Sequence, residues 1–350
     1  MNLGIFLSPG ESFSQMKQSG QDIRFINLYL KNYAQNFKKI YVFSYANEKI
    51  KLPANIVLVP NTTGLHRLIY ALLLPKIHIS KVNQCDVVRG FGLASSISSF
   101  FLAKPFIINW AYDYISFVKL QKKIFYIPLY FILEKLAFWK AKKVFIATRS
   151  KFARLNGKKF IYLQNGVDTK LFKPTVDHQK GLVFVGRLEK QKNLHFLISA
   201  VSLLPERLRH VTLVGNGSLV EELMTFAKRR VKLSIIPSVA HNKLPRLLKK
   251  FSIFLLPSLQ EGSPKVLIEA MACGLVPVVT NFPTASEVVS DGKDGFITDF
   301  NRENFASKIK LLLSDQALYE KMSRQAVSKI RKDFDQEQLI KKEMSILKNV

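Results

Sequence analysis

The sequence predicts an α/β protein with two Rossmann-like domains in tandem. Short apolar segments alternate along the chain with longer amphipathic segments, which is the pattern of parallel strands joined by helices. A length of 350 residues is long for one hydrophobic core and sufficient for two. The content of 48% hydrophobic and 22% charged residues is that of a globular chain and excludes an intrinsically disordered one.

The first series of strands and helices occupies roughly the first 150 residues. Strands are expected at residues 4–7, 39–44, 56–59, 86–88, 106–109 and 144–147, and the two clearest helices at residues 22–37 and 124–139. The strand segments are almost continuously apolar, as expected where helices cover both faces of a parallel sheet.

A second series begins after residue 180. Its strands are expected at residues 181–185, 211–214, 233–235, 253–256 and 277–279, with helices at residues 194–204, 219–229 and 243–250. The last residues, 334–350, form a charged amphipathic segment that predicts one more helix.

The chain is strongly basic, with a formal net charge of +28. Residues 1–172 carry +18 of this charge and the rest carries +10. Such an excess suits contact with anionic lipid, nucleic acid or a phosphorylated acceptor. No nucleic-acid-binding module is recognisable, so nucleic acid is the least favoured of these partners.

Several features favour a cytoplasmic protein. Cys85 and Cys273 stand alone without metal-ligand spacing, which suits a reducing compartment. Residues 1–10 have the character of a first strand and its turn rather than of a signal peptide. No apolar run reaches the length needed to span a bilayer.

Residues 256–274 are the most informative segment. They place Glu261 in the loop after a buried strand and Glu269 on the following helix. Ser263 is expected to be the N-cap of that helix, with Pro264 at its first position and Gly274 at its end. In an open α/β sheet the loops at the carboxyl ends of strands face the ligand crevice, and a helix start there suits a phosphate.

This segment resembles the signature of the retaining GT-B glycosyltransferases of family 4, which use sugar nucleotides as donors. The signature is Glu-x7-Glu followed by Ala-Met-Ala-x-Gly. Further segments match the family in order and spacing, namely residues 164–174, 185–192, 213–217 and 287–289. The resemblance is dense over residues 160–300. It implies the GT-B fold, in which two Rossmann-like domains face each other across a cleft.

The resemblance also implies a division of labour between the domains. Residues 1–172 would form the acceptor domain and residues 173–333 the nucleotide-sugar donor domain. In this family the last helix often crosses back to the first domain, and we expect residues 334–350 to do so.

Arg187 and Lys192 resemble the family's diphosphate-binding pair. A guanidinium and an ammonium near the β-phosphate would stabilise the charge that develops on the leaving group. Taken alone, the two residues would be ordinary solvated bases in a lysine-rich chain. Because the basic pair can neutralise the diphosphate and no Asp-x-Asp motif is present, no metal or other cofactor is expected.

Glu269 resembles the carboxylate that accepts hydrogen bonds from ribose hydroxyls, and Glu261 resembles the residue beside the transferred sugar. The structural alternative for both is a solvated glutamate. With Arg187 and Lys192, Glu261 forms the expected catalytic set. The donor-binding residues implied by the resemblance are Gly20, Gly186, Arg187, Lys192, Glu261, Gly262, Ser263, Pro264, Lys265, Val266 and Glu269.

The first domain departs from the family. Many members place a histidine near the end of one of its strands, and the comparable strand ends here contain none. Arg89, Asn109 and Asp113 are the residues at these strand ends that could contact sugar or acceptor, although roles in turn formation are equally compatible with their positions.

Residues 114–143 interleave aromatic residues with lysines. A basic helix with bulky apolar residues suits the interface of an anionic membrane. A core helix with a lysine-rich exposed end is the alternative.

Together these features predict a retaining glycosyltransferase that moves a sugar from a nucleoside diphosphate to a lipid-linked or membrane-near glycan acceptor. Such enzymes commonly build cell-surface polysaccharide, and this one would act peripherally on the inner face of the cell membrane. The alternatives are a GT-B sugar-nucleotide epimerase and a non-catalytic membrane-surface relative.

Overall fold

The computed structural model describes residues 1–18, 21–110, 115, 118–119, 123–153, 155, 157–175 and 181–350. Two compact units make up the chain. The first unit comprises Met1–Gln164 together with Glu337–Val350, and the second comprises Asn165–Gln336. The change from one unit to the next falls at Gln164 and Asn165, whereas the sequence placed it at residues 172 and 173.

The first unit is built on a parallel seven-stranded sheet in the order β3-β2-β1-β4-β5-β6-β7. Its strands are β1 (Asn2–Phe6), β2 (Lys39–Phe43), β3 (Ile56–Val59), β4 (Val87–Gly90), β5 (Phe106–Trp110), β6 (Lys143–Ile146) and β7 (Phe160–Tyr162). The register sets Leu3 of β1 beside Ile40 of β2 and Val87 of β4. Apolar residues that alternate along each strand therefore enter cores on both faces of the sheet.

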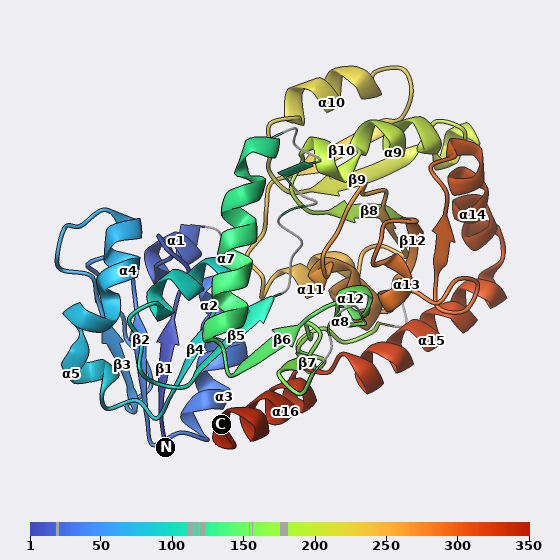
Figure 1. Cartoon of the computed structure of the whole chain (residues 1–350). Coiled ribbons are helices and arrows are strands. Elements are labelled where there is room, and N and C mark those ends of the chain that lie inside the picture. Colours follow the sequence, from blue (N-terminus) through green and yellow to red (C-terminus); the bar gives the residue numbers. More distant parts are fainter. Residues whose placement is uncertain are drawn as a thin grey trace. The chain divides into compact units, whose positions relative to one another are not determined.

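One face of this sheet is covered by the first helices of the chain and by the last. These are α1 (Phe13–Gln18), α2 (Asp22–Phe25), the π-helical turn η1 (Ile26–Leu30), α3 (Lys31–Ala34) and α16 (Gln336–Lys348). Ile340, Met344 and Leu347 of α16 are buried against Leu3 and Ile5 of β1. The C-terminal helix thus completes the core of the first unit (Figure 1).

The opposite face is covered by a second group of helices. They are α4 (Arg67–Ile77), α5 (Ile79–Val82), the 3-10 helix η2 (Leu93–Ser99) and α7 (Ile127–Lys140), which the short η3 (Ile124–Tyr126) precedes; α8 (Arg149–Phe152) follows β6. Tyr70 of α4, Leu93 of η2 and Ala137 of α7 share one core with Phe6 of β1.

The second unit has a parallel six-stranded sheet in the order β10-β9-β8-β11-β12-β13. Its strands are β8 (Leu182–Val185), β9 (His210–Val214), β10 (Lys232–Ile236), β11 (Ile253–Leu256), β12 (Val276–Thr280) and β13 (Phe296–Thr298). Both units are therefore doubly wound α/β folds, as the sequence predicts.

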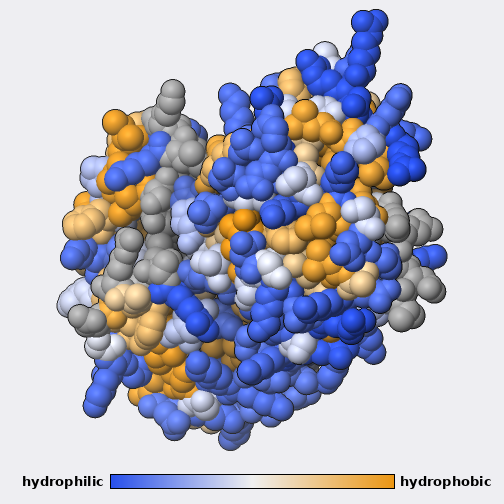
Figure 2. Space-filling view, turned by 90° about the vertical axis from the view of Figure 1, so that its right-hand side faces the viewer, coloured by the Kyte–Doolittle hydropathy of each residue, from blue (hydrophilic) through white to orange (hydrophobic). Residues whose placement is uncertain are grey.

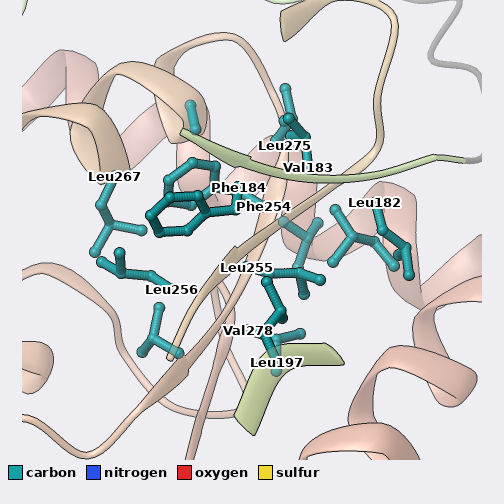
Figure 3. Packing of buried hydrophobic residues seen from close by; sticks show 14 of the residues in the cluster. Leu182, Val183, Phe184, Leu197, Phe254, Leu255, Leu256, Leu267, Leu275 and Val278 are labelled. Carbon is teal, nitrogen blue, oxygen red and sulfur yellow. The ribbon is translucent and has the colours of Figure 1, made fainter. Parts of the chain in front are cut away.

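The second unit has one continuous core. Its α-helices are α9 (Leu194–Val201), α10 (Val220–Ala227), α11 (Leu244–Leu248), α12 (Lys265–Ala272), α13 (Ala285–Val288), α14 (Arg302–Ser314) and α15 (Gln316–Asp333), and its 3-10 turns are η4 (Lys190–Lys192) and η5 (Glu206–Leu208). Figure 3 shows Phe184 of β8 beside Phe254 of β11, with Leu267 of α12 close to both. The core thereby fixes α12 against the two central strands.

The sequence missed some elements. The strands β7 and β13 and the helices α4, α14 and α15 were not predicted. The expected helix at residues 22–37 is α2, η1 and α3 in succession, interrupted by a π-helical turn. The mixture of polar and apolar positions in α14 and α15 gives a weaker pattern than the continuously apolar strands do.

Hydrophilic residues cover much of the face shown in Figure 2, and hydrophobic residues form patches among them. Within the described part of the chain, none of the helices combines the length and the apolar character that crossing a bilayer requires.

Candidate functional site

The strand order of the second sheet reverses between β8 and β11, which are neighbours although β9 and β10 lie between them in the sequence. At such a switch point the loops that follow the two central strands diverge and leave a crevice at the carboxyl edge of the sheet. Arg187 and Lys192 follow β8, and Glu261 follows β11. The topology therefore brings the three expected catalytic residues to the position at which open α/β sheets bind ligands.

Glycines allow the loop after β8 to pack closely against the loop after β9. The amide of Gly186 donates to Val214 O over 2.9 Å, and that of Leu188 donates to Asn216 O over 2.9 Å. Gly215 has φ of +149°, and a Cβ on it would lie 1.9 Å from Gly186 O. This contact fixes the backbone that leads to Arg187, whose side chain is exposed.

Lys192 and Glu261 form an ion pair, with 2.5 Å between Nζ and Oε1. Their side chains are 16% and 9% exposed, so the pair is shielded from water on most sides. The buried Ser258 hydroxyl donates to the same carboxylate oxygen over 2.6 Å. Two residues that the sequence places 69 positions apart are thus direct partners.

The two loops are also tied through Gln191. Its Nε2 donates to Gln260 O over 2.6 Å, and its carbonyl accepts from the amide of Leu259 over 3.0 Å. These bonds hold Lys192 and Glu261 at a fixed separation.

Glu269 lies on α12 and is almost completely buried, with 2% exposed. Its Oε1 is 3.0 Å from Nε2 of His241, which lies in the turn before α11. A buried carboxylate needs such a partner because desolvation penalises its charged form. The sequence identified Glu269 but gave no role to His241.

The start of α12 differs from the prediction in one respect. The helix begins at Lys265 with Pro264 as its N-cap, so the expected N-cap role of Ser263 and first helical position of Pro264 are wrong. Pro264 has ψ of 90° and provides no side-chain cap for the first amides of the helix. Gly262 and Ser263 lie in the loop just before it, and Lys265 and Val266 in the first turn. At its other end, Gly274 has φ of +91° and terminates the helix as predicted.

Arg89 and Asn109 lie near the carboxyl ends of the neighbouring central strands β4 and β5 of the first sheet. Nη1 of Arg89 is 3.4 Å from Oδ1 of Asn109, which also accepts from the amide of Gly92 over 2.8 Å. Arg89 is 3% exposed and its Nε donates to Glu343 of α16 over 2.6 Å. Burial, the largest single effect, works to lower the pKa of Arg89, but Glu343 together with Tyr33 and Tyr29 outweighs it and the pKa is raised.

Burial also raises the pKa of the Tyr33 hydroxyl, and the nearby Glu343 adds to the effect. That hydroxyl donates to Oε1 of Glu343 over 2.9 Å. Arg89, Tyr33 and Glu343 therefore form a buried network that fastens α16 to the sheet of the first unit.

Two of the expected residues, Gly20 and Asp113, lie outside the described residues. Among the side chains that the structure does describe, no group of three or more His, Cys, Asp and Glu residues could hold a metal ion.

The residues that the sequence missed are Ser258, Gln191 and His241. Each follows a strand of the second sheet at the edge where Glu261 lies: Ser258 comes after β11, Gln191 after β8 and His241 after β10. The one sequence feature that could have indicated these residues is their position just after a predicted strand, because loops at the carboxyl ends of parallel strands converge. No spacing of residue types marks them.

Known proteins resemble this chain in sequence over its second half and in overall fold. The model of the family described as glycosyl transferases group 1 matches residues 168–329. The chain is 29% identical over 203 residues to UDP-Gal:alpha-D-GlcNAc-diphosphoundecaprenol alpha-1,3-galactosyltransferase of Escherichia coli, covering 51% of each protein. It is 29% identical over 173 residues to the capsular polysaccharide biosynthesis glycosyltransferase CapM of Staphylococcus aureus, covering 47% of this chain and 45% of the relative.

The chain thus spans about half the length of these curated relatives. Among solved structures, sucrose-phosphate synthase from Thermosynechococcus elongatus superposes with a TM-score of 0.80, covering 100% of this chain and 98% of the other at 15% identity. That likeness is one of fold. Residues 168–329 are therefore similar to the glycosyl transferases group 1, within a chain that has the GT-B fold.

Proposed function

We propose that this protein is a retaining glycosyltransferase that moves a sugar from a nucleoside-diphosphate sugar to a lipid-linked glycan acceptor in cell-surface polysaccharide biosynthesis. The observation that carries the proposal is the pairing of Lys192 with Glu261 at the switch point of the second sheet. The relatives support the substrate classes, because one is named for UDP-galactose and a diphosphoundecaprenol acceptor and another for capsular polysaccharide. UDP is accordingly the first nucleotide to test.

The donor would lie over the loops that follow β8 and β11. Arg187 and Lys192 would stabilise the diphosphate as negative charge develops on it, without a metal ion or other cofactor. Glu269 would accept hydrogen bonds from the ribose, and Glu261 would lie beside the transferred sugar. The amides of Gly262, Ser263, Lys265 and Val266 would face the sugar and the phosphate at the start of α12.

The chemistry follows from a leaving group that also acts as a base. The bond between the anomeric carbon and the β-phosphate oxygen breaks, and the acceptor hydroxyl forms the new bond on the same face of the sugar. The acceptor proton passes to the departing phosphate. Lys192 would balance the charge on that phosphate, and its partner Glu261 would stabilise positive charge at the anomeric carbon.

A transfer assay tests this reaction. UDP-[14C]galactose, UDP-[14C]glucose and UDP-[14C]N-acetylglucosamine would each be incubated with a diphosphoundecaprenol-linked N-acetylglucosamine acceptor. Label should move into the lipid fraction, and the new linkage should be α by NMR. Lys192→Ala should lower kcat/KM by about 10²-fold or more, because it removes a charge that stabilises the leaving group. Lys190→Ala, a change at a neighbouring exposed lysine, should leave kcat/KM within about twofold.

The outcomes separate the parts of the proposal. A β linkage would contradict retention, and release of free sugar or an epimerised donor without lipid product would favour the epimerase alternative. Equal rates for the Lys192 and Lys190 variants would contradict the role given to the ion pair.

The second part of the proposal is that α7 contacts the anionic lipids on the inner face of the cell membrane. In α7 only Ala137 is buried among the described residues, while Leu129, Phe131, Ile132 and Trp139 are 51%, 51%, 62% and 70% exposed. A helix that only completes a core buries its apolar residues, whereas an interfacial helix leaves them available to lipid. The exposures therefore favour membrane contact over the core-helix alternative.

Lysines accompany these side chains. Nζ of Lys140 lies 5.0 Å from the ring centre of Trp139, and Nζ of Lys135 lies 5.3 Å from that of Phe131. Such pairs match an interface at which rings enter the lipid boundary and ammonium groups meet anionic headgroups.

Vesicle flotation tests the membrane contact. Wild-type protein should float with vesicles containing 30% phosphatidylglycerol at about 0.1 M salt and much less with pure phosphatidylcholine vesicles. Ile132→Glu should reduce the bound fraction severalfold. Leu203→Glu provides the matched control, because Leu203 is 50% exposed in the second unit. Binding that is indifferent to lipid charge and to Ile132→Glu would contradict the proposed surface.

A further inference from the structure

His241 lies close to the buried carboxylate of Glu269, although no sequence motif connects them. Its side chain is 9% exposed and that of Glu269 is 2% exposed. The distance of 3.0 Å between Nε2 and Oε1 is that of a hydrogen bond. A carboxylate oxygen accepts hydrogen bonds, so a hydrogen bond between these two atoms requires the proton to lie on Nε2 of His241.

The imidazole is held from a second side by Phe172. The two ring centres are 5.1 Å apart, and Phe172 is 1% exposed. Phe172 is fixed in turn, because its amide donates to Asp168 O over 2.8 Å and the Asp168 carboxylate accepts from the amide of Leu171 over 3.0 Å. The ring of His241 therefore has Glu269 on one side and Phe172 on another.

The hydrogen bond from His241 constrains how the carboxylate of Glu269 is turned. Once Oε1 is held by Nε2, the plane of the Glu269 carboxylate and the direction of its second oxygen follow from the χ angles of the side chain. Recognition of a hydroxyl group depends on that direction, since hydrogen bonds weaken steeply when they are misaligned.

We propose that His241 is a positioning residue for nucleotide recognition: it orients Glu269 so that the carboxylate accepts hydrogen bonds from the ribose hydroxyls of the donor. This inference rests on the proposed function and deepens it. It assigns the discrimination between ribose and deoxyribose to a pair of residues, His241 and Glu269, rather than to Glu269 alone.

Calorimetric binding of UDP, 2′-deoxy-UDP and 3′-deoxy-UDP tests the proposal. Wild-type protein should bind UDP at least about tenfold more tightly than one of the deoxy analogues. His241→Phe keeps a ring against Phe172 and removes the donor. It should weaken UDP binding about tenfold and reduce the preference over that analogue to less than about threefold. His241→Gln can place an N–H near the position of Nε2 and should restore much of the preference.

His195 offers a matched control. Its Nε2 is 2.9 Å from Oε1 of Glu222, but the two side chains are 36% and 59% exposed. His195→Phe should leave both the affinity for UDP and the preference over the deoxy analogues within about twofold of wild type. A double variant, His241→Phe with Glu269→Ala, should be no weaker than Glu269→Ala alone, because the two residues act as one unit.

The results distinguish three cases. If His241→Phe leaves the preference for UDP unchanged, weakening UDP and the deoxy analogues by the same factor, His241 has only a structural role and the proposal is overturned. If the wild-type protein binds UDP with no preference over either analogue, the ribose role falls while the nucleotide site stands. Binding of none of the three nucleotides by wild-type protein would contradict the proposed UDP-linked donor and this inference together.

Discussion

At the scale of single residues, the two glutamates of the Glu-x7-Glu segment have different surroundings. Glu261 is partly accessible and paired with a lysine, whereas Glu269 is buried and paired with a histidine. The difference indicates different tasks. A carboxylate beside a loop lysine can respond to charge that develops during a reaction, and a buried, oriented carboxylate suits recognition of a fixed group.

This difference predicts distinct kinetic effects for the two alanine substitutions. Glu269→Ala should weaken binding of the nucleotide by about tenfold or more, since it removes an acceptor of hydrogen bonds. Glu261→Ala should lower kcat more than it changes the Kd for the donor, because the interaction proposed for Glu261 would strengthen in the transition state. Steady-state kinetics with a separate measurement of Kd would check both, and near-wild-type values in the two variants would contradict the assignment.

The buried cysteines predict how stability depends on pH. Burial raises the pKa of Cys273 to about 12 and that of Cys85 to about 12. In the unfolded chain a cysteine has a pKa of about 8.5. The folded state therefore favours the protonated thiols, and this contribution is present below about pH 8.5 and lost as the pH rises toward 12.

Urea unfolding at pH 8, 9, 10 and 11 should show a falling free energy of unfolding. Each thiol contributes at most about 1.4 kcal/mol per pH unit to the slope. Cys273→Ala should make the slope shallower, whatever its effect on stability at pH 8. An identical slope in that variant would show that Cys273 does not titrate differently on unfolding.

At the scale of elements, the sequence predicted the central strands of both sheets well because each is a continuous apolar segment. The sequence was a poorer guide to those elements and helix ends that are determined by contacts between residues distant in sequence. The edge strands β7 and β13 are only three residues long, and the N-cap of α12 depends on a loop that Gln191 and Thr284 hold in place. His241 and Ser258 were missed for the same reason, since each is identified by its partner in space and not by its neighbours in sequence.

The contact between the loops after β8 and β9 predicts a sensitivity at Gly215. A Cβ there would meet the backbone oxygen of Gly186 at 1.9 Å, so Gly215→Ala should displace the loop that carries Arg187. We expect a loss of about 2 kcal/mol or more in the free energy of unfolding, together with weaker nucleotide binding.

Gly292→Ala is the control for the Gly215 prediction. Gly292 has φ of +70° and nothing within 4 Å of its added Cβ, so the change should cost about 1–2 kcal/mol of backbone strain and leave nucleotide binding unchanged. Urea unfolding would measure the stability of both variants, and calorimetry would measure their nucleotide binding. Tight nucleotide binding by Gly215→Ala would contradict the role given to this loop contact.

At the scale of the whole molecule, the chain returns at its end to the unit in which it began. The helix α16 follows the second unit in sequence and packs in the core of the first. Its attachment includes one buried charged pair, Arg89 with Glu343. A buried pair of this kind is sensitive to the removal of one partner, because the other is left charged and without compensation.

Glu343→Ala should therefore destabilise the first unit by about 3–5 kcal/mol. Lys341→Ala, at an exposed position of the same helix, should change stability by less than about 0.5 kcal/mol. Hydrogen exchange followed by mass spectrometry should report faster exchange in β4 and α16 of the Glu343 variant. Protection equal to wild type in those segments would contradict the proposed role of the pair.

The measurement that tests the central claim most directly is thermal unfolding of the full chain with UDP, GDP, ADP or CMP. A nucleotide at a hundredfold excess over its Kd should add about 2.7 kcal/mol of stability. We expect one diphosphate, UDP first among them, to raise the Tm of the wild type and to raise that of Glu269→Ala by about half as much or less, because tenfold weaker binding leaves at most about 1.4 kcal/mol of stabilisation. A Tm that no nucleotide raises, or one that rises equally in both proteins, would contradict a donor site built around Glu269.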